Sequence, residues 1–215
     1  MKFSTKAKNL INLKKLNLKK SIIPKFYYYS VDELMKNKKK IVKIINVNLN
    51  KKISIRSSFF LEDKSSSSLA GEFDGLYNVN NNKKNVLNGI AFLIKQYKKK
   101  SKNKKILLKS EIIFQNHLIE SALSGVLTNK CIKDGTDYYV INYDDISGST
   151  NTVTSGSKTG GRVINIFKDE TNFIRSKKLK KVVETTKEIE LKIGEKYIDL
   201  EFAIDKKGNV NIFQI

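Results

Sequence analysis

The 215-residue chain has one cysteine, one histidine, one proline and no tryptophan. A single cysteine, Cys131, cannot form an internal disulfide or build a thiolate metal site alone, and this pattern is typical of a reducing cytosol. No stretch approaches the roughly 20 consecutive apolar residues that a membrane-spanning helix requires. The N-terminus also lacks the apolar core of a secretory signal. We therefore expect a cytoplasmic protein without a membrane partner.

Arginine is scarce too, although the chain is strongly basic. Lysine and arginine total 42 against 21 acidic residues, which gives a net charge of +21, and every cation except Arg56, Arg162 and Arg175 is a lysine. Proteins that read base sequence rely on the planar fork of arginine, which forms two hydrogen bonds with guanine. A lysine-rich surface attracts polyanions without selecting among them. We therefore do not expect nucleic-acid binding to be the main role, and it stays an alternative.

Hydrophobic patterning predicts helices and strands without a regular β-α-β alternation, which favours the α+β class. Helices are predicted over 6–18, 85–97 and 177–191, with a short one starting near Glu33. Strands are predicted over 26–29, 53–57, 106–114, 122–128, 137–142, 197–204 and 209–215. The basic stretch 98–105 is typical of a solvated connector. It divides the chain into an N-terminal lobe, residues 1–104, and a C-terminal lobe, residues 105–215.

The two closing strands carry the first candidate site. Side chains alternate along residues 199–205, so Glu201 lies on the face opposite Leu200 and Phe202. If a turn at 205–208 joins the strands, Glu201 faces Ile212 and is the diagonal neighbour of Gln214. A carboxylate and an amide oxygen at that spacing suit Mg²⁺, which takes few protein ligands. The alternative is an ordinary hairpin with a solvated face.

Arg56 is the second candidate. It ends a predicted strand and is followed by serines and a small-residue loop. A guanidinium in that position can hold phosphate oxygens through two parallel hydrogen bonds. The alternative is a surface ion pair with Glu62 or Asp63.

Several stretches, taken in order, resemble the nucleotide-binding domain of the phosphoenolpyruvate synthase and pyruvate phosphate dikinase family. They are residues 56–58 (RSS), 62–63 (ED), 68–71 (SLAG), 76–79 (LYNV), 124–128 (SGVLT), 199–205 (DLEFAID) and 213–215 (FQI). Residues 5–10 (TKAKNL) resemble the family's opening motif more loosely. Among its members, the sequence is most similar to the L-glutamine kinases of capsule phosphoramidate synthesis.

The resemblance implies an α+β, ATP-grasp-like fold in which two lobes enclose Mg·ATP. By motif match, Lys6 and Arg56 are the catalytic cations on the phosphates. Gly71 belongs to the nucleotide-binding loop, and the backbone near Ile112 faces adenine. Glu201 and Gln214 bind both the nucleotide and the metal. The implied cofactors are therefore ATP and Mg²⁺.

The family passes the β-phosphoryl group of ATP to a histidine on a swivelling domain, with release of AMP and phosphate. The lone histidine, His117, lies in no such motif, and we expect it to be a surface or packing residue. The chain is thus expected to supply the ATP-binding half of a kinase. The phosphohistidine and acceptor domains would lie in a missing remainder of the chain or in a separate protein.

Three departures from the family pattern weaken this interpretation. Ser4 and Thr5 replace the opening glycines, residues 148–151 lack a glycine and a glutamate, and the family continues with arginine and proline beyond Ile215. The alternative is a non-catalytic fragment that binds nucleotide or serves as an interaction module.

Overall fold

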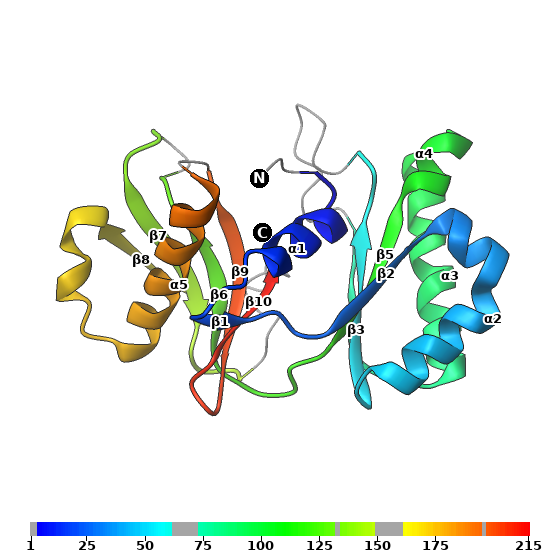
Figure 1. Cartoon of the computed structure of the whole chain (residues 1–215), viewed down its shortest axis with the longest axis horizontal. Helices are drawn as coiled ribbons and strands as arrows, with labels where there is room; N and C mark the ends of the chain where they lie inside the picture. The colour runs from blue at the N-terminus through cyan, green and yellow to red at the C-terminus, as the bar shows by residue number, and fades with distance from the viewer. Residues whose placement is uncertain (1–3, 62–72, 132–133, 149–160, 195–196) are drawn as a thin grey trace. The chain divides into compact units, whose positions relative to one another are not determined.

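The computed structural model describes residues 4–61, 73–131, 134–148, 161–194 and 197–215. The chain divides into two compact units. Unit 1 combines Leu10–Ile23 with Leu118–Ile215, and unit 2 combines the segment that ends at Asn9 with Pro24–His117 (Figure 1). Helix α1 (Lys6–Lys15) crosses this division, since its first turn groups with unit 2 and the rest with unit 1.

Unit 2 is built on a four-stranded antiparallel sheet. Its order is β2 (Phe26–Ser30), β5 (Glu111–Asn116), β3 (Lys52–Ser58) and β4 (Leu76–Asn80). Three helices pack on one face, namely α2 (Val31–Asn48), α3 (Lys83–Lys100) and α4 (Lys104–Lys109). The hydrophobic core lies between the helices and the sheet, which leaves the other face of the sheet for polar side chains.

Helix α2 begins at a complete capping box. The Ser30 hydroxyl accepts a hydrogen bond from the Glu33 backbone at 3.2 Å, and the Glu33 carboxylate accepts from the Ser30 backbone at 2.8 Å. These bonds satisfy amide groups that the helix itself leaves unpaired. The helix continues through the lysine run, with a kink at Asn37 (φ −125°, ψ 24°), and ends only at Asn48. It is therefore much longer than the short helix that the sequence predicts.

The boundary expected between residues 104 and 105 falls inside α4, whereas the two units meet along the chain at His117 and Leu118. The reason lies in strand pairing. Strand β5 pairs with β2 on one edge and β3 on the other, so residues 111–116 form the centre of the sheet in unit 2. The charged run is only the end of α3 and the start of α4.

Unit 1 is built on a six-stranded sheet in the order β1-β10-β9-β6-β7-β8. The strands are β1 (Ser21–Ile22), β10 (Val210–Gln214), β9 (Asp199–Asp205), β6 (Ser121–Thr128), β7 (Tyr138–Asp144) and β8 (Arg162–Phe167). Neighbours are antiparallel except for β1 and β10. The 3₁₀ turn η1 (Lys168–Phe173) leads from β8 toward α5 (Lys177–Ile193), whose apolar side packs on the sheet.

No helix in the described ranges combines the length and the apolar character needed to span a bilayer.

Candidate functional site

The sheet of unit 2 places Arg56 on its polar face. Ile53 and Ile55 of β3 point into the helix-covered core, so Arg56 points the opposite way. Across the strand pair Arg56 lies opposite Ile113. Its side chain is buried, with 8% of its surface exposed. A buried guanidinium is a costly feature that persists only where other groups compensate its charge.

At one end of this face, a buried carboxylate ties the N-terminal segment to the sheet. Glu111 accepts hydrogen bonds from the Thr5 hydroxyl at 2.6 Å and the Ser58 hydroxyl at 3.2 Å. The Ala7 backbone in turn donates to the Ser58 oxygen at 3.1 Å. Thr5 and Ala7 flank Lys6, so the structure holds the Lys6 segment at the end of the face that carries Arg56. The sequence motifs alone gave no reason to single out Glu111.

At the other end of the face lie Ser54 and Gln115, which are cross-strand partners. The Ser54 hydroxyl is 2.9 Å from Nδ1 of His117. Burial lowers the pKa of His117, and the nearby Lys52 lowers it further. Gln115 is fully buried, and neither polar atom of its side-chain amide has a hydrogen-bond partner in the described structure. An unpaired buried amide lowers the stability of the fold by about 1–3 kcal/mol. The sequence motifs did not single out Gln115, which is a candidate for a polar contact on this face of the sheet.

The structure gives no support to the other two expected nucleotide contacts of unit 2, Ile112 and Gly71. Ile112 lies in the middle strand, its side chain is in the hydrophobic core, and its backbone is paired with Tyr29 and Ser57 on the two edges. The predicted approach of adenine to this backbone has no structural argument in its favour and stays a prediction. Gly71 lies outside the described residues.

In unit 1, Glu201 and Gln214 lie directly opposite each other on β9 and β10. The expected register paired Glu201 with Ile212. The strands instead pair Phe202 with Ile212, one residue away from the expected register, and an irregularity after Ile212 adds a second residue, so that Glu201 pairs with Gln214. Directly opposite Cβ atoms are about 4.5–5.5 Å apart, closer than the diagonal spacing expected from the sequence. The row continues through Val126 of β6 to Asn142 of β7.

The oxygen pair of Glu201 and Gln214 fits a magnesium ion in its donor chemistry. Both residues are half-buried, and Mg²⁺ is usually held by one or two protein oxygens, with water and phosphate completing its shell. Among the described residues, no three His, Cys, Asp or Glu side chains gather at one point. The metal role of this pair stays a prediction.

The neighbouring row on the same face contains a second buried acid. Asp144 of β7 lies opposite Ser124 of β6 and is 2% exposed. One of its oxygens accepts from the backbone of Ile146 at 2.9 Å and of Ser147 at 3.0 Å, and the other accepts from the Ser147 hydroxyl. These bonds give Asp144 a structural role in shaping the turn that follows β7.

The glycine of the Ser-Gly-Val stretch, Gly125 on β6, lies very close to the backbone of β7. A Cβ atom on Gly125 would lie 2.3 Å from the backbone oxygen of Asn142 and 2.9 Å from Cα of Tyr143. Only glycine allows the two strands to approach this closely.

Another polar cluster of unit 1 joins α5 to the sheet. Glu190 accepts hydrogen bonds from Lys168 at 2.7 Å, Tyr139 at 2.5 Å and Asn129 at 2.8 Å. Burial raises the pKa of Glu190, but these donors outweigh it and lower the pKa below its usual value. The pKa of Tyr139 is raised by burial and by its bond to Glu190. Because Glu190 accepts hydrogen bonds from three side chains, we assign this cluster a structural role in holding α5 against the sheet.

Comparison with known proteins finds likeness in structure but not in sequence. No family model matches the chain, and no curated protein matches it. Three solved structures show the same fold: an L-amino acid ligase from Bacillus licheniformis (13% identity, TM-score 0.52), a D-alanine-D-alanine ligase from Helicobacter pylori (11%, 0.50), and a carboxyaminoimidazole ribonucleotide synthase from Aspergillus clavatus complexed with ATP (9%, 0.50).

These matches cover 98%, 98% and 97% of the chain, which itself spans only 42%, 50% and 43% of the three proteins in the same order. The three proteins are ATP-grasp enzymes. The chain therefore has an ATP-grasp fold, which confirms the fold expected from the sequence. At identities of 9–13% this likeness shows the fold alone.

Proposed function

We propose that the chain binds Mg·ATP and supplies the ATP-binding half of an AMP-forming phosphotransferase of the phosphoenolpyruvate synthase and pyruvate phosphate dikinase type. The L-glutamine kinases are the members whose sequence it resembles most. The observation that carries the proposal is the placement of the motif residues. Arg56 lies on the polar sheet face of unit 2, and Glu201 faces Gln214 on the polar sheet face of unit 1.

Arg56 would hold phosphate oxygens through its rigid fork of donors. Its 8% exposure favours this role over a solvated surface ion pair, because a buried guanidinium gains more from a phosphate than an exposed one does. Lys6 would add a second positive charge from a segment that Thr5 and Ala7 fix to the sheet. Charge neutralisation of this kind supplies most of the catalysis in phosphoryl transfer.

Glu201 and Gln214 would hold the magnesium ion through one carboxylate oxygen and one amide oxygen. The chemistry that a bound Mg²⁺ would supply there is neutralisation of the phosphate charge. The two side chains come from paired strands of one hairpin, so the backbone fixes their separation.

The phosphoryl acceptor in this proposal is a histidine on a domain that the chain does not supply. His117 is a poor candidate because its Nδ1 is engaged with Ser54 and its backbone is held in the sheet by a bond to Lys52. A swivelling phosphohistidine domain and an acceptor-binding domain would be the partners, and the cytoplasm would be the compartment.

Calorimetry with ATP in the presence and absence of Mg²⁺ tests the binding step. We expect Glu201→Gln to weaken Mg·ATP binding by about tenfold or more while leaving the weaker metal-free binding unchanged, since it replaces the only charged protein ligand of the proposed pair by a neutral amide oxygen. Glu120→Gln is the matched control, because this exposed glutamate of unit 1 pairs with Lys206 at the surface. Equal Mg·ATP affinity in the two variants would remove the metal role of Glu201.

Phosphorus NMR with ATP, Mg²⁺ and glutamine separates the remaining alternatives. The proposal predicts no phosphorylated glutamine from the chain alone. Adding a phosphohistidine domain of the family should produce AMP and phosphate. Formation of ADP with a phosphorylated acceptor would instead favour direct transfer from the γ position. Binding without turnover, even with that domain present, would favour the alternative of a non-catalytic nucleotide-binding module. Nucleic-acid binding that persists at physiological salt would favour the third alternative.

A further inference from the structure

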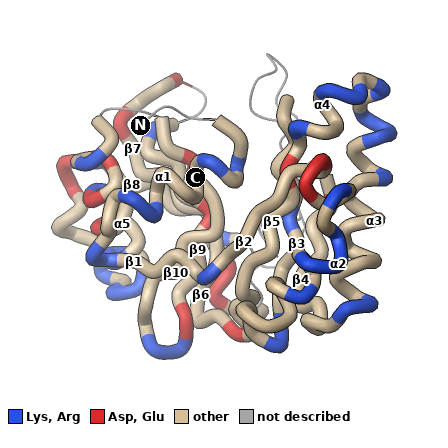
Figure 2. Tube along the Cα trace, turned by 45° about the vertical axis from the view of Figure 1, so that its right-hand side comes forward, with Lys and Arg blue, Asp and Glu red and all other residues tan. Residues whose placement is uncertain are grey.

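A basic groove runs along the outer surface of unit 2, between helices α2 and α3. Its volume is about 500 Å³. Four lysines line it, Lys38, Lys39, Lys43 and Lys83, and no acidic residue does. Figure 2 shows the lysine-rich segments along these helices. The groove lies on residues that neither the proposed nucleotide site nor the sequence motifs use.

The lining residues form a regular helical pattern. On α2 they lie four residues apart in two adjacent rows, one from Lys38 to Asn46 and the other from Lys39 to Val47. Helix α3 adds Leu87 and a lysine one turn before it. Each row on α2 is about 12 Å long, or slightly more than two helical turns. Together with the two residues of α3, these rows line a groove that is long enough to accept the apolar side of another helix.

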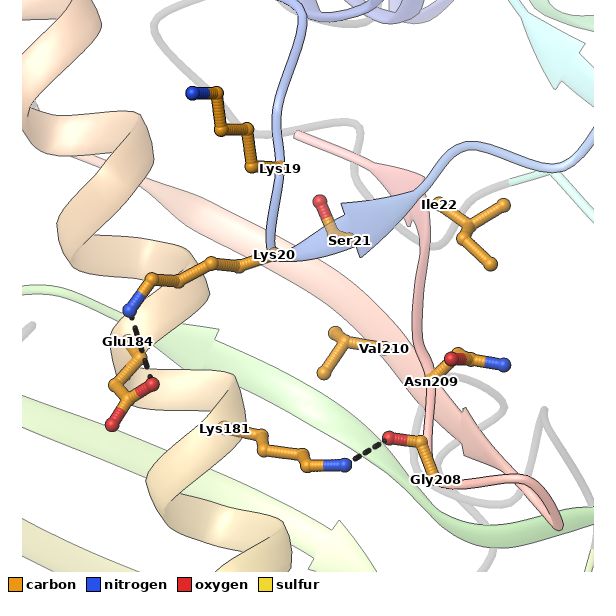
Figure 3. Close-up of a pocket in the computed structure, with 9 residues that line it drawn as sticks. All are labelled: Lys19, Lys20, Ser21, Ile22, Lys181, Glu184, Gly208, Asn209 and Val210. Carbon is orange, nitrogen blue, oxygen red and sulfur yellow. Dashed lines mark hydrogen bonds and ion pairs between the residues drawn. The ribbon is translucent and has the colours of Figure 1, made fainter.

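The charge of the groove is not compensated within the described part of the chain, where none of the four lysines forms an ion pair. A smaller cavity of unit 1, about 270 Å³, behaves differently (Figure 3). There Lys20 pairs with Glu184 at 3.1 Å, and Lys181 donates to the Gly208 carbonyl at 2.7 Å. The lysines of the groove are therefore available to an anionic partner.

The floor of the groove is apolar and open. Val42 is buried, but Val47 keeps 74% of its surface exposed. Sites for small molecules bury about 70–90% of their ligand, and an open floor of this kind does not enclose one. A second copy of this chain also fits poorly, because it would add another net charge of +21. A flat membrane surface does not fill a concave groove.

We propose that this groove docks an acidic amphipathic helix of a partner protein. Apolar side chains of that helix lie on Val42, Val47 and Leu87, and its flanking carboxylates meet the four lysines. The lysines set the association rate and partner choice, and the apolar floor sets the dissociation rate.

The test uses the full chain and a fluorescein-labelled synthetic peptide of about 15 residues. The peptide has leucines three and four positions apart and glutamate at most other positions, and a scrambled peptide of equal composition is its control. Fluorescence anisotropy should show saturable binding of the amphipathic peptide and at least about tenfold weaker binding of the scrambled one. The affinity should also fall as salt rises, because exposed charges are screened.

Two variants report on the groove itself. The double variant Lys39→Glu/Lys43→Glu should weaken the peptide by at least about tenfold. Its matched control, Lys40→Glu/Lys95→Glu, makes the same charge change on the same two-helix layer outside the groove and should stay within about twofold. Val47→Gln keeps the charge and should weaken binding about threefold or more. Because all these positions are exposed, thermal unfolding should confirm that each variant folds.

The contrary outcomes are equally clear. Equal losses in the two double variants, or equal binding of the two peptides, would mean that the groove acts only as part of a diffuse positive surface. An unchanged affinity of Val47→Gln would remove the apolar floor from the interface. Binding to phosphatidylglycerol vesicles that Lys39→Glu/Lys43→Glu abolishes, without binding of the peptide, would mean that a membrane is the partner and would overturn the proposal.

Discussion

Replacing Gly125 by alanine tests how closely β6 and β7 pack in unit 1. The added Cβ would meet the Asn142 backbone oxygen at 2.3 Å and the Tyr143 Cα at 2.9 Å. Ordinary contact between such atoms begins at about 3.4 Å, so roughly 1 Å of movement is needed. Both atoms belong to the backbone of a paired strand, and a side-chain rotation cannot supply that movement.

The expected cost follows from this geometry. Overpacking a tight site costs about 1–3 kcal/mol, and the rigidity of a paired strand places Gly125→Ala in the upper part of that range, at about 2–3 kcal/mol. For a chain of this length each kcal/mol lowers Tm by roughly 2–4 °C. We therefore expect Tm to fall by about 4–12 °C.

The assay is thermal unfolding by circular dichroism, with hydrogen exchange to locate the loss in unit 1. Gly161→Ala is the matched control, because its Cβ would lie 3.2 Å from the side-chain oxygen of the same Asn142, which can rotate away. The control should change stability by no more than about 0.5 kcal/mol. If Gly125→Ala unfolds at the same temperature as the unmodified chain, the close approach of the two strands described here is wrong.

Two further predictions concern unit 2. Tyr97→Phe should cost about 1–3 kcal/mol in urea unfolding, because the buried hydroxyl donates to the Glu111 carbonyl at 2.7 Å and accepts from the Ser58 backbone at 3.0 Å; an unchanged midpoint would contradict this bridge. For His117, burial and the nearby Lys52 lower the pKa in the folded state. The unfolded state then binds more protons, so stability is full above the unfolded pKa of about 6.5 and is lost as pH falls through the folded pKa. As pH falls from 8 to 5, the urea midpoint should therefore fall less steeply in His117→Gln than in the unmodified chain. The same pH dependence in the two proteins would contradict this assignment to His117.

Sequence reasoning succeeded where patterning and packing agree. The predicted helix over 177–191 is observed as α5, and the strands and turn of the closing hairpin lie where alternation placed them. The predicted register of this hairpin was wrong by two residues on β10. One residue arises at the turn, where the Asp205 backbone donates to the Asn209 carbonyl, and the other arises at the irregularity after Ile212, of which the residue pattern carries no trace.

Other errors arose where local and tertiary signals conflict. Residues 106–114 have the hydrophobic density of a strand, yet Lys104–Lys109 form α4, because Asn103 caps a helix there. Glu111 and Gln115 lie in none of the sequence motifs. They were missed because what distinguishes them is the burial of a polar side chain on a sheet face. Strand pairing over long distances decides such burial, and a single sequence does not encode it in any short pattern.

The route of the chain between the units has a consequence for synthesis on the ribosome. All of unit 2 has been made once residue 117 has emerged, so its sheet can close during translation. Unit 1 must wait, because β1 pairs in parallel with β10, and the partners Ser21 and Val210 are 189 residues apart. Until β10 is made, β1 and the second half of α1 are nascent chain without their final neighbours. At elongation rates of about 5–20 residues per second this delay lasts on the order of ten seconds or more. During that time residues 10–23 lack their final neighbours and are a natural binding site for a chaperone.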